Sequence, residues 1–176
     1  MAIEVRGALY QGIKNVFPHI ADIVRPDLGG YFEREFDPNG WYEGEPYVAT
    51  LEYLLEHISP QALVIMGNEL TNVVTSELRE LGITSTGAFA EKVASVYPHF
   101  VRGPGTGEYV VEEYRPGRLV IKDSSIIRSV EFIRGVLTAG FTGLGALNVR
   151  VTVLDNRAEN AEVNRYVVEW MEPDDV

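Results

Sequence analysis

The second half of the chain contains two pairs of strand-like segments separated by one helical segment, and this order constrains the fold more than any other feature. The first pair covers residues 108–114 and 118–122, joined by the turn sequence Arg115-Pro116-Gly117. The second pair covers residues 147–153 and 163–170. Connections this short cannot hold the crossover that parallel strands need, so we expect both pairs to be antiparallel.

The first half of the chain is dominated by apolar residues at helical spacing. Capping chemistry marks two helix starts, because Ser59 precedes a proline and because Ser85 or Thr86 precedes the next apolar stripe. Gly82 and Pro98 are suited to ending these two helices. The helices that we expect cover residues 4–24 with a bend or stop near Phe17-Pro18, 47–58, 60–81, 86–97, and, after a cap at Asp123-Ser124, 126–144.

These elements predict the α+β fold class, in which a mainly helical part, residues 1–100, packs on an antiparallel sheet. Residues 101–170 supply that sheet as two hairpins that flank a helix. The 176 residues match a single domain, which ends in an acidic tail at 171–176 that we expect to be frayed. Strict alternation in the second hairpin predicts one inward face, made of Leu147, Val149, Val151 and Val153.

Charge and composition exclude several classes of function. The net charge is -11, so neither a nucleic acid nor a membrane surface is expected as a partner, because phosphate binding needs clustered Lys and Arg. The absence of cysteine excludes disulfides, thiolate metal sites and cysteine nucleophiles. No signal peptide is evident, and no apolar stretch approaches the ~20 residues that cross a bilayer. We therefore expect a cytoplasmic protein.

Five aromatic residues lie in the segment 26–46, whose other residues are typical of turns. They are Tyr31, Phe32, Phe36, Trp41 and Tyr42. A solvated linker would not carry so many aromatic rings, so we expect this segment to fold onto the core or onto a partner.

Three segments of the second half carry a resemblance to a known family. They are Phe100-Val101-Arg102-Gly103 with the following hairpin, the helical Phe132-Ile133-Arg134-Gly135-Val136-Leu137, and the closing strand pair at 149–153 and 166–170. Over about residues 60–170 the chain resembles a ligand-binding superfamily. Its members include four-vinyl-reductase-type domains, haem-NO-binding and haem-NO-binding-associated domains, and Golgi-transport tethering subunits; the chain looks closest to uncharacterised bacterial members. The resemblance implies the fold and a role in sensing small molecules.

The chain departs from these relatives at their metal and cofactor sites. Four-vinyl-reductase-type domains often carry two cysteines around the last hairpin, whereas this chain has Asn164 near the matching position and no cysteine. Haem-binding members use a proximal histidine and a Tyr-x-Ser-x-Arg motif. Here Tyr114 and Arg118 keep the spacing, but Pro116 replaces the serine within a predicted hairpin turn. The resemblance therefore does not imply haem, and we expect no cofactor and no metal.

No residue pattern predicts catalysis, so we do not expect an enzyme. The histidines His19, His57 and His99 lie in separate segments without a metal-binding pair; one of them could hold haem iron, although a helix-end or surface position is more typical. The glycine-rich segment 103–107 lacks the Gly-Lys-Ser/Thr ending of a phosphate loop and precedes a strand. No serine lies in a Gly-x-Ser-x-Gly sequence, and the many carboxylates fit a solvated acidic surface.

The candidate site lies around the helix between the two hairpins. Four glycines lie between positions 135 and 145, and a glycine inside a helix costs about 1 kcal/mol, so this run needs a reason. Close packing on the sheet or on a second subunit is one reason, and a cavity beside the helix is another. We expect an apolar pocket with Arg134 as its polar anchor. The predicted ligand-binding residues are Trp41, Phe89, Phe132, Arg134 and Phe141.

Three functions remain open from the sequence. The first is a sensor or regulatory module that binds a small apolar or amphipathic molecule and signals through a separate protein. The second is a dimeric scaffold or adaptor without a ligand, whose small-residue helix would lie at the two-fold interface. The third is a haem-based gas sensor. A homodimer is expected under the first two.

Overall fold

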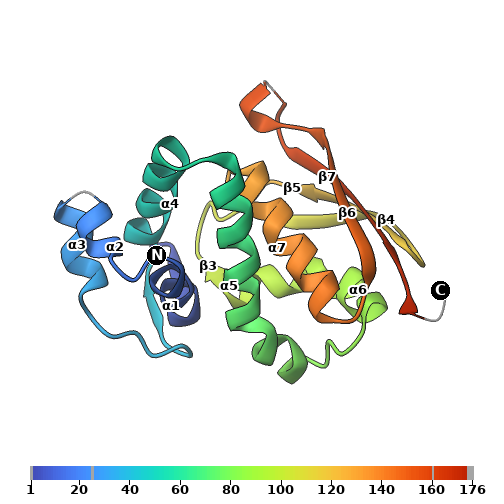
Figure 1. Ribbon diagram of the computed structural model, residues 1–176, viewed down its shortest axis with the longest axis horizontal. Helices are drawn as coiled ribbons and strands as arrows, with labels where there is room; N and C mark the ends of the chain where they lie inside the picture. Colours follow the sequence, from blue (N-terminus) through green and yellow to red (C-terminus); the bar gives the residue numbers. More distant parts are fainter. Residues whose placement is uncertain (1, 25, 160, 174–176) are drawn as a thin grey trace.

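The computed structural model describes residues 2–24, 26–159 and 161–173, apart from the side chains at positions 73, 74 and 76. Four helices, α1 to α4, form one end of the molecule, and a four-stranded sheet forms the other end (Figure 1). The long helix α5 lies between these ends, directly beside α7 (Figure 1).

The helical part of the chain also contains short strands. Its elements are β1 (Glu4–Arg6), α1 (Gly7–Val16), α2 (Ile20–Ile23), α3 (Pro26–Phe32), β2 (Trp41–Glu43), α4 (Glu45–His57), α5 (Pro60–Glu80), α6 (Thr86–Val96) and the 3-10 turn η1 (Tyr97–His99). The strand β3 (Val101–Arg102) pairs with β1, and β1 pairs with β2, so this small sheet has the order β2-β1-β3 and is antiparallel.

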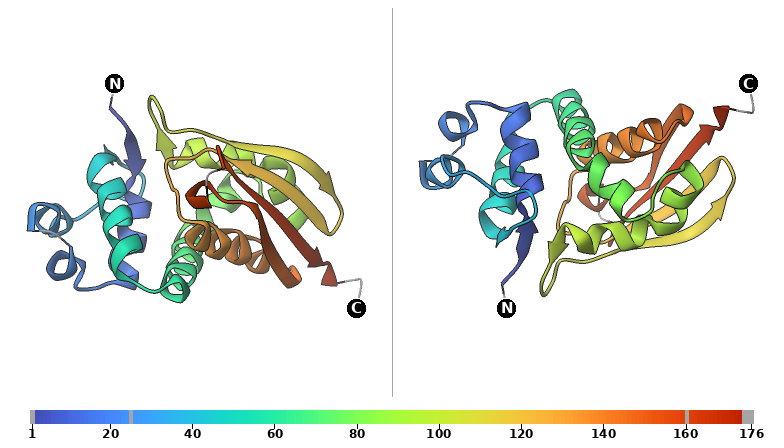
Figure 2. Two further views of the ribbon diagram at one scale, coloured as in Figure 1. Left: turned by 90° about the horizontal axis from the view of Figure 1, so that it is seen from above. Right: turned by 90° about the horizontal axis from the view of Figure 1, so that it is seen from below.

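The second part of the chain builds the larger sheet. Its elements are β4 (Tyr109–Arg115), β5 (Arg118–Asp123), α7 (Val130–Gly143), β6 (Leu147–Asp155), the 3-10 turn η2 (Arg157–Glu159) and β7 (Asn164–Met171). The strand order is β4-β5-β7-β6, and every pairing is antiparallel. The predicted α+β class and the two hairpins flanking a helix are therefore confirmed. Helices α6 and α7 pack against this sheet (Figure 2).

Two of the predicted helix caps are confirmed. The hydroxyl of Ser59 accepts a hydrogen bond from the backbone N–H of Ala62, and that of Ser85 accepts one from Ala88, each at 3.2 Å. Such caps satisfy backbone donors that the first turn of a helix leaves unpaired. Gly82 follows α5 with a φ of +72°, a conformation that glycine adopts without strain.

Four local predictions were wrong. Residues 4–6 form strand β1, and residues 26–32 form helix α3 within the segment expected to be irregular. Helix α7 begins at Val130 behind a cap at Ser129, whose hydroxyl accepts from the N–H of Phe132 at 3.0 Å. Leu147 was expected to face inward, but 41% of it is exposed. Positive φ angles at Gly145 and Asn148 surround Leu147 and rotate the start of β6 out of register with the rest of the strand.

The acidic tail lies only partly within the described residues. Residues 174–176 lie outside them, so fraying there stays a prediction. Within the described part, the backbone ends with β7 and a short turn after it.

The aromatic segment 26–46 folds onto the core of the helical end, which is one of the two outcomes expected from the sequence. The ring of Phe36 stacks on Tyr10 of α1 at a centroid distance of 4.4 Å, and Phe32 meets the same ring edge-on at 5.5 Å. Both phenylalanines are buried. These rings therefore form the core of the helical end.

Helices α5 and α7 approach each other so closely that glycine is required at the contact. A Cβ atom on Gly135 of α7 would lie 2.1 Å from the carbonyl oxygen of Val64, and one on Gly67 of α5 would lie 2.1 Å from that of Phe132. Farther along α7, a Cβ on Gly140 would lie 2.6 Å from the ring of Phe89. Close packing inside the chain therefore explains two glycines of the α7 run.

Candidate functional site

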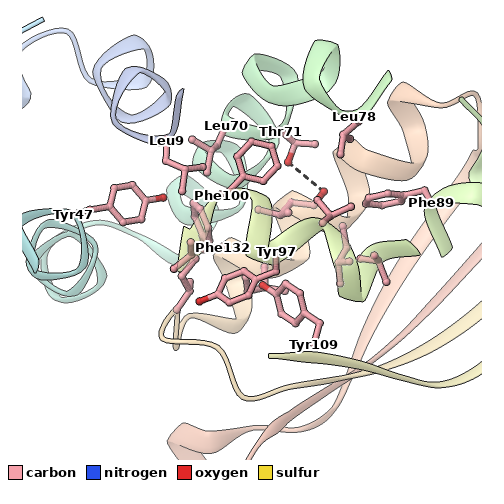
Figure 3. Close-up of a pocket in the computed structure, with 17 residues that line it drawn as sticks. Leu9, Tyr47, Leu70, Thr71, Leu78, Phe89, Tyr97, Phe100, Tyr109 and Phe132 are labelled. Carbon is pink, nitrogen blue, oxygen red and sulfur yellow. Dashed lines mark hydrogen bonds between the residues drawn. The ribbon is translucent and has the colours of Figure 1, made fainter. Parts of the chain in front are cut away.

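An apolar cavity of about 100 Å³ lies where the helical end meets α5, α6 and α7. Its wall is almost entirely carbon, and most of the residues that line it are buried. Figure 3 shows that these side chains converge from α1, α4, α5, α6, α7 and the segment after α6. Those lining residues are Leu9, Tyr47, Leu70, Thr71, Leu78, Phe89, Val93, Val96, Tyr97, Phe100, Val101, Tyr109, Ile127, Phe132, Ile133, Val136 and Leu137.

A second hollow of about 40 Å³ lies next to the first, between α4, α5 and the start of α7. Phe132 and Ile127 line both spaces, so the ring of Phe132 forms part of the wall between them. Phe132 is 1% exposed and is held at the first turn of α7 by the Ser129 cap. This ring therefore separates the two hollows together with Ile127.

Four side chains bring polar atoms to the cavity, and three of these atoms have partners. The hydroxyl of Thr71 donates to the carbonyl of Gly67 at 3.0 Å, and that of Tyr97 donates to the carbonyl of Thr106 at 2.8 Å. The hydroxyl of Tyr109 hydrogen-bonds with Ser125. The hydroxyl of Tyr47 is buried and has no hydrogen-bond partner among the described residues.

Burial keeps the tyrosine hydroxyls of the cavity protonated. Desolvation is the largest cause that raises the pKa of Tyr47, Tyr97 and Tyr109 above the ordinary value. A protonated hydroxyl can donate a hydrogen bond, so Tyr47, a residue of the cavity wall, has an unused donor.

Of the five predicted ligand-binding residues, Phe89 and Phe132 line the cavity. Phe141 lies behind Phe89, with ring centroids 5.1 Å apart, and its other neighbour is Trp170 at 4.5 Å. Phe141 therefore supports the wall without being part of it.

The two remaining predicted residues lie elsewhere. Trp41 lies on β2, where the guanidinium of Arg102 is 3.9 Å and that of Arg6 is 5.1 Å from its ring. Arg134 is exposed on α7 and borders an open hollow of about 500 Å³ that β6 lines on its other side. The polar anchor expected from Arg134 is therefore not at the apolar cavity, whose free polar group is Tyr47.

None of the three histidines lines the cavity. His19 and His99 are exposed, and His57 is exposed with its ring stacked on Tyr53 at 3.9 Å. Among the described residues no group of three or more His, Asp or Glu side chains is arranged to hold a metal ion. The described helices also include none with the length and apolar character needed to cross a membrane.

The segment that shares the Tyr and Arg spacing of haem-binding relatives forms the predicted hairpin turn. Tyr114 on β4 pairs with Leu119, and Arg118 on β5 pairs with Arg115 next to that turn; neither Tyr114 nor Arg118 lines the cavity. The guanidinium of Arg118 is held by the carboxylates of Glu113 at 3.2 Å and Glu169 at 3.0 Å. Arg118 therefore forms ion pairs on the surface of the sheet and does not reach the cavity.

Sequence reasoning missed the residues that close the cavity from the helical side. Leu9 and Tyr47 have the spacing of ordinary core positions on α1 and α4, and no local pattern separates them from other core residues. Tyr97, Phe100 and Tyr109 lie at the ends of elements, where helical or strand periodicity carries no information. The aromatic content of residues 97–109 is the one sequence signal that could have indicated this wall.

Comparison with known proteins gives the class of fold. The chain has the fold of the H-NOX, or haem-NO-binding, domains, and this likeness extends over nearly its whole length. No family model matches the sequence, and no curated protein matches it either. At the low identities found, the likeness is one of fold.

Three solved structures illustrate the likeness. An H-NOX protein from S. oneidensis in the Fe(II) state has a TM-score of 0.70 at 11% identity, covering 95% of this chain and 96% of that one. An oxygen-binding H-NOX domain related to soluble guanylate cyclases has a TM-score of 0.69 at 8% identity, with 95% and 93% coverage. The Fe(II) unliganded H-NOX protein from K. algicida has a TM-score of 0.62 at 14% identity, with 95% and 97% coverage.

Proposed function

We propose that this chain is a sensor domain that binds a small, largely apolar molecule in the cavity beside Phe132 and that catalyses no reaction. The observation that carries the proposal is the cavity itself, because native interiors are packed at crystal-like density and rarely keep space of this size. An engineered apolar cavity of roughly 150 Å³ in another protein stays dry and binds benzene or xenon. A cavity of about 100 Å³ therefore suits a molecule smaller than benzene.

The position of the cavity also supports a sensing role. Its wall takes side chains from the helical end and from the elements that pack on the large sheet, so a bound molecule contacts both ends of the protein. A ligand shifts a conformational equilibrium only through contacts that differ between two states. A site at this junction provides such contacts.

Haem is the second candidate, because the solved structures with the same fold include haem-ligated H-NOX proteins. The residues of this chain do not fit that group. The cavity of about 100 Å³ is below the roughly 300–1,000 Å³ of ordinary cofactor pockets, and it contains no histidine, cysteine or charged side chain among its described lining residues. We therefore do not assign haem to this site.

Haem binding can be tested by adding haemin to the purified protein and recording the visible absorption spectrum. We expect no Soret band beyond that of free haemin and no rise in the melting temperature. A saturable Soret band that is lost in His99→Ala, His57→Ala or His19→Ala would show that a histidine of this chain ligates iron, and it would replace the apolar ligand by haem.

The proposed apolar site can be tested with xenon as the probe. We expect saturable shifts in the methyl NMR signals of lining residues such as Leu70 and Val93, but not of the exposed Leu154. Val93→Phe places a ring in the cavity and should abolish these shifts. The matched control is Val110→Phe on the exposed face of β4, which should leave them unchanged.

The outcome that contradicts the proposal is equally concrete. If xenon shifts the methyl signals of Val93→Phe as much as those of the unmodified protein, the molecule binds elsewhere. If the unmodified protein shows no saturable shift, the cavity is not a binding site.

The adaptor reading depended on the small-residue helix lying at a subunit interface. In this chain Gly135 faces α5 and Gly140 faces Phe89, so these two glycines have neighbours within the chain. A homodimer stays a prediction, which sedimentation velocity would test.

A further inference from the structure

We infer that the ligand of the cavity carries a hydrogen-bond acceptor, such as a carbonyl, ether or hydroxyl oxygen, which binds the hydroxyl of Tyr47. This inference rests on the proposed function, because it concerns the chemistry of the molecule that enters the same cavity. It replaces the charged polar anchor expected at Arg134, a cation, by a neutral hydrogen-bond donor.

This inference rests on the hydroxyl of Tyr47. Tyr47 lies in the first turn of α4 and is fully buried. Figure 3 shows its ring reaching from α4 toward Leu9, Phe100 and Phe132, with the hydroxyl at the leading end. Nearly all buried polar groups in native proteins have partners, but the described residues Thr50 and Asn68 also have a buried side-chain atom without one. Tyr47 differs from them because it lines the cavity, and this coincidence points to a partner inside the cavity.

The surroundings of Tyr47 limit what that partner can be. A buried water molecule usually needs about three hydrogen bonds, but the cavity wall is almost entirely carbon. The hydroxyls of Thr71 and Tyr97 already donate to backbone carbonyls. A molecule with an apolar body and a single acceptor satisfies Tyr47 and fills the remaining space, whereas water would be poorly held.

The size of the cavity limits the ligand further. If benzene with six heavy atoms occupies roughly 150 Å³, then about 100 Å³ corresponds to about four or five heavy atoms. An anionic molecule is disfavoured, because no described lining residue carries a positive charge and burying an unpaired charge is costly. The class is thus a short ketone, ether or alcohol.

The test compares two molecules of the same shape, 2-butanone and 2-methyl-1-butene, which differ in whether a carbonyl oxygen is present. Their dissociation constants are measured by methyl NMR for the unmodified protein, for Tyr47→Phe and for Tyr166→Phe. A neutral hydrogen bond has a net value of about 1 kcal/mol, which is about fivefold in affinity. We expect the ratio of the ketone constant to the alkene constant to rise about fivefold in Tyr47→Phe.

Tyr166→Phe is the matched control. It removes a buried hydroxyl that donates to the carboxylate of Asp123 outside the cavity lining, so it should lower the melting temperature and leave the ligand ratio unchanged. Tyr47→Phe should not lower the melting temperature, since the hydroxyl it removes has no partner in the part of the chain that the structure describes.

The possible failures are distinguishable. If both probes bind and their ratio is the same in Tyr47→Phe as in the unmodified protein, the cavity is a binding site but Tyr47 does not recognise the ligand. If Tyr47→Phe melts several degrees lower, its hydroxyl has a partner within the protein and the inference is wrong. If neither probe nor xenon binds, the proposed function fails and this inference with it.

Discussion

Replacing Gly135 by alanine tests whether α5 and α7 meet as closely as described. The added Cβ would lie 2.1 Å from the carbonyl oxygen of Val64, about 1.2 Å short of a normal C–H···O contact of roughly 3.3 Å. The obstacle is backbone, so it cannot be relieved by rotating a side chain. The helices must separate, and overpacking of this kind costs up to about 3 kcal/mol.

The better helix propensity of alanine offsets about 1 kcal/mol of that cost. We therefore expect Gly135→Ala to lower the free energy of unfolding by about 2 kcal/mol. For a chain of this length, that corresponds to a fall in the melting temperature of roughly 4–8 °C. Urea unfolding followed by circular dichroism measures the change as a lower midpoint at unchanged slope.

Gly143→Ala is the matched control, because it makes the same substitution in the same helix. Apart from its own helix backbone and chain neighbours, no heavy atom of the described residues lies within 4 Å of the Cβ that this change adds. It should therefore stabilise the protein, by roughly 0.4–1 kcal/mol, through the lower entropy of the unfolded chain. If Gly135→Ala were as stable as Gly143→Ala, the close contact between α5 and α7 would be refuted.

Three further predictions concern the cavity wall and the large sheet. Phe132→Ala should lower the free energy of unfolding by about 3–5 kcal/mol and join the two hollows into one larger cavity. Benzene should then raise the melting temperature of this variant more than that of the unmodified protein. An equal rise in both proteins would refute the position of the Phe132 ring. Ser129→Ala should cost about 1 kcal/mol in urea unfolding, because the N–H of Phe132 loses its cap, and an unchanged midpoint would contradict that assignment. Burial raises the pKa of Asp123 in the folded protein above the pKa of about 3.9 that an aspartate has in the unfolded chain. The protonated side chain therefore contributes stability that is fully present below about pH 3.9 and is lost as the pH rises through the pKa of the folded protein. The stability of Asp123→Asn relative to the unmodified protein should therefore rise with pH, and a constant difference between about pH 4 and about pH 8 would count against the raised pKa.

The large sheet could be predicted because its signals are local. The turn Arg115-Pro116-Gly117 sets the first hairpin, and Gly117 has the positive φ of +76° that such turns favour. The caps at Ser59 and Ser85 were predicted for the same reason, since each depends on residues within one helical turn.

The start of α7 was mispredicted because two segments offered similar capping chemistry. Asp123 and Ser124 can cap a helix, but Asp123 ends the buried strand β5 and its carboxylate accepts the N–H of Ser125 at 2.7 Å. The sheet pairing of β5 with β7 continues through Asp123, and this tertiary interaction delays the helix to Ser129. The pairing of β5 with β7 cannot be predicted from the residues around Asp123 alone.

For the candidate site, too, some residues could be predicted from local sequence and others could not. Phe89 and Phe132 were predicted because they lie on the inner faces of apolar helices, where any cavity beside α7 must be lined. Arg134 was predicted as an anchor because it lies within the apolar part of α7, yet its place on the helix turns it to the surface. Helical position, and not sequence neighbourhood, decides which side chains reach a common space.

Tyr47 could not have been predicted, and the reason applies to apolar binding sites in general. A site that binds by desolvation uses the same leucine, valine and phenylalanine side chains as the core, so its sequence is that of a core. What distinguishes the two is whether the space is filled and whether every buried polar atom has a partner. The hydroxyl of Tyr47 has no partner among the described residues, and Tyr47 lines a cavity that is not filled. Both features arise only when α1, α4 and α7 pack together. The coincidence of an unfilled space with an unused donor is therefore stronger support for a ligand than either would be alone.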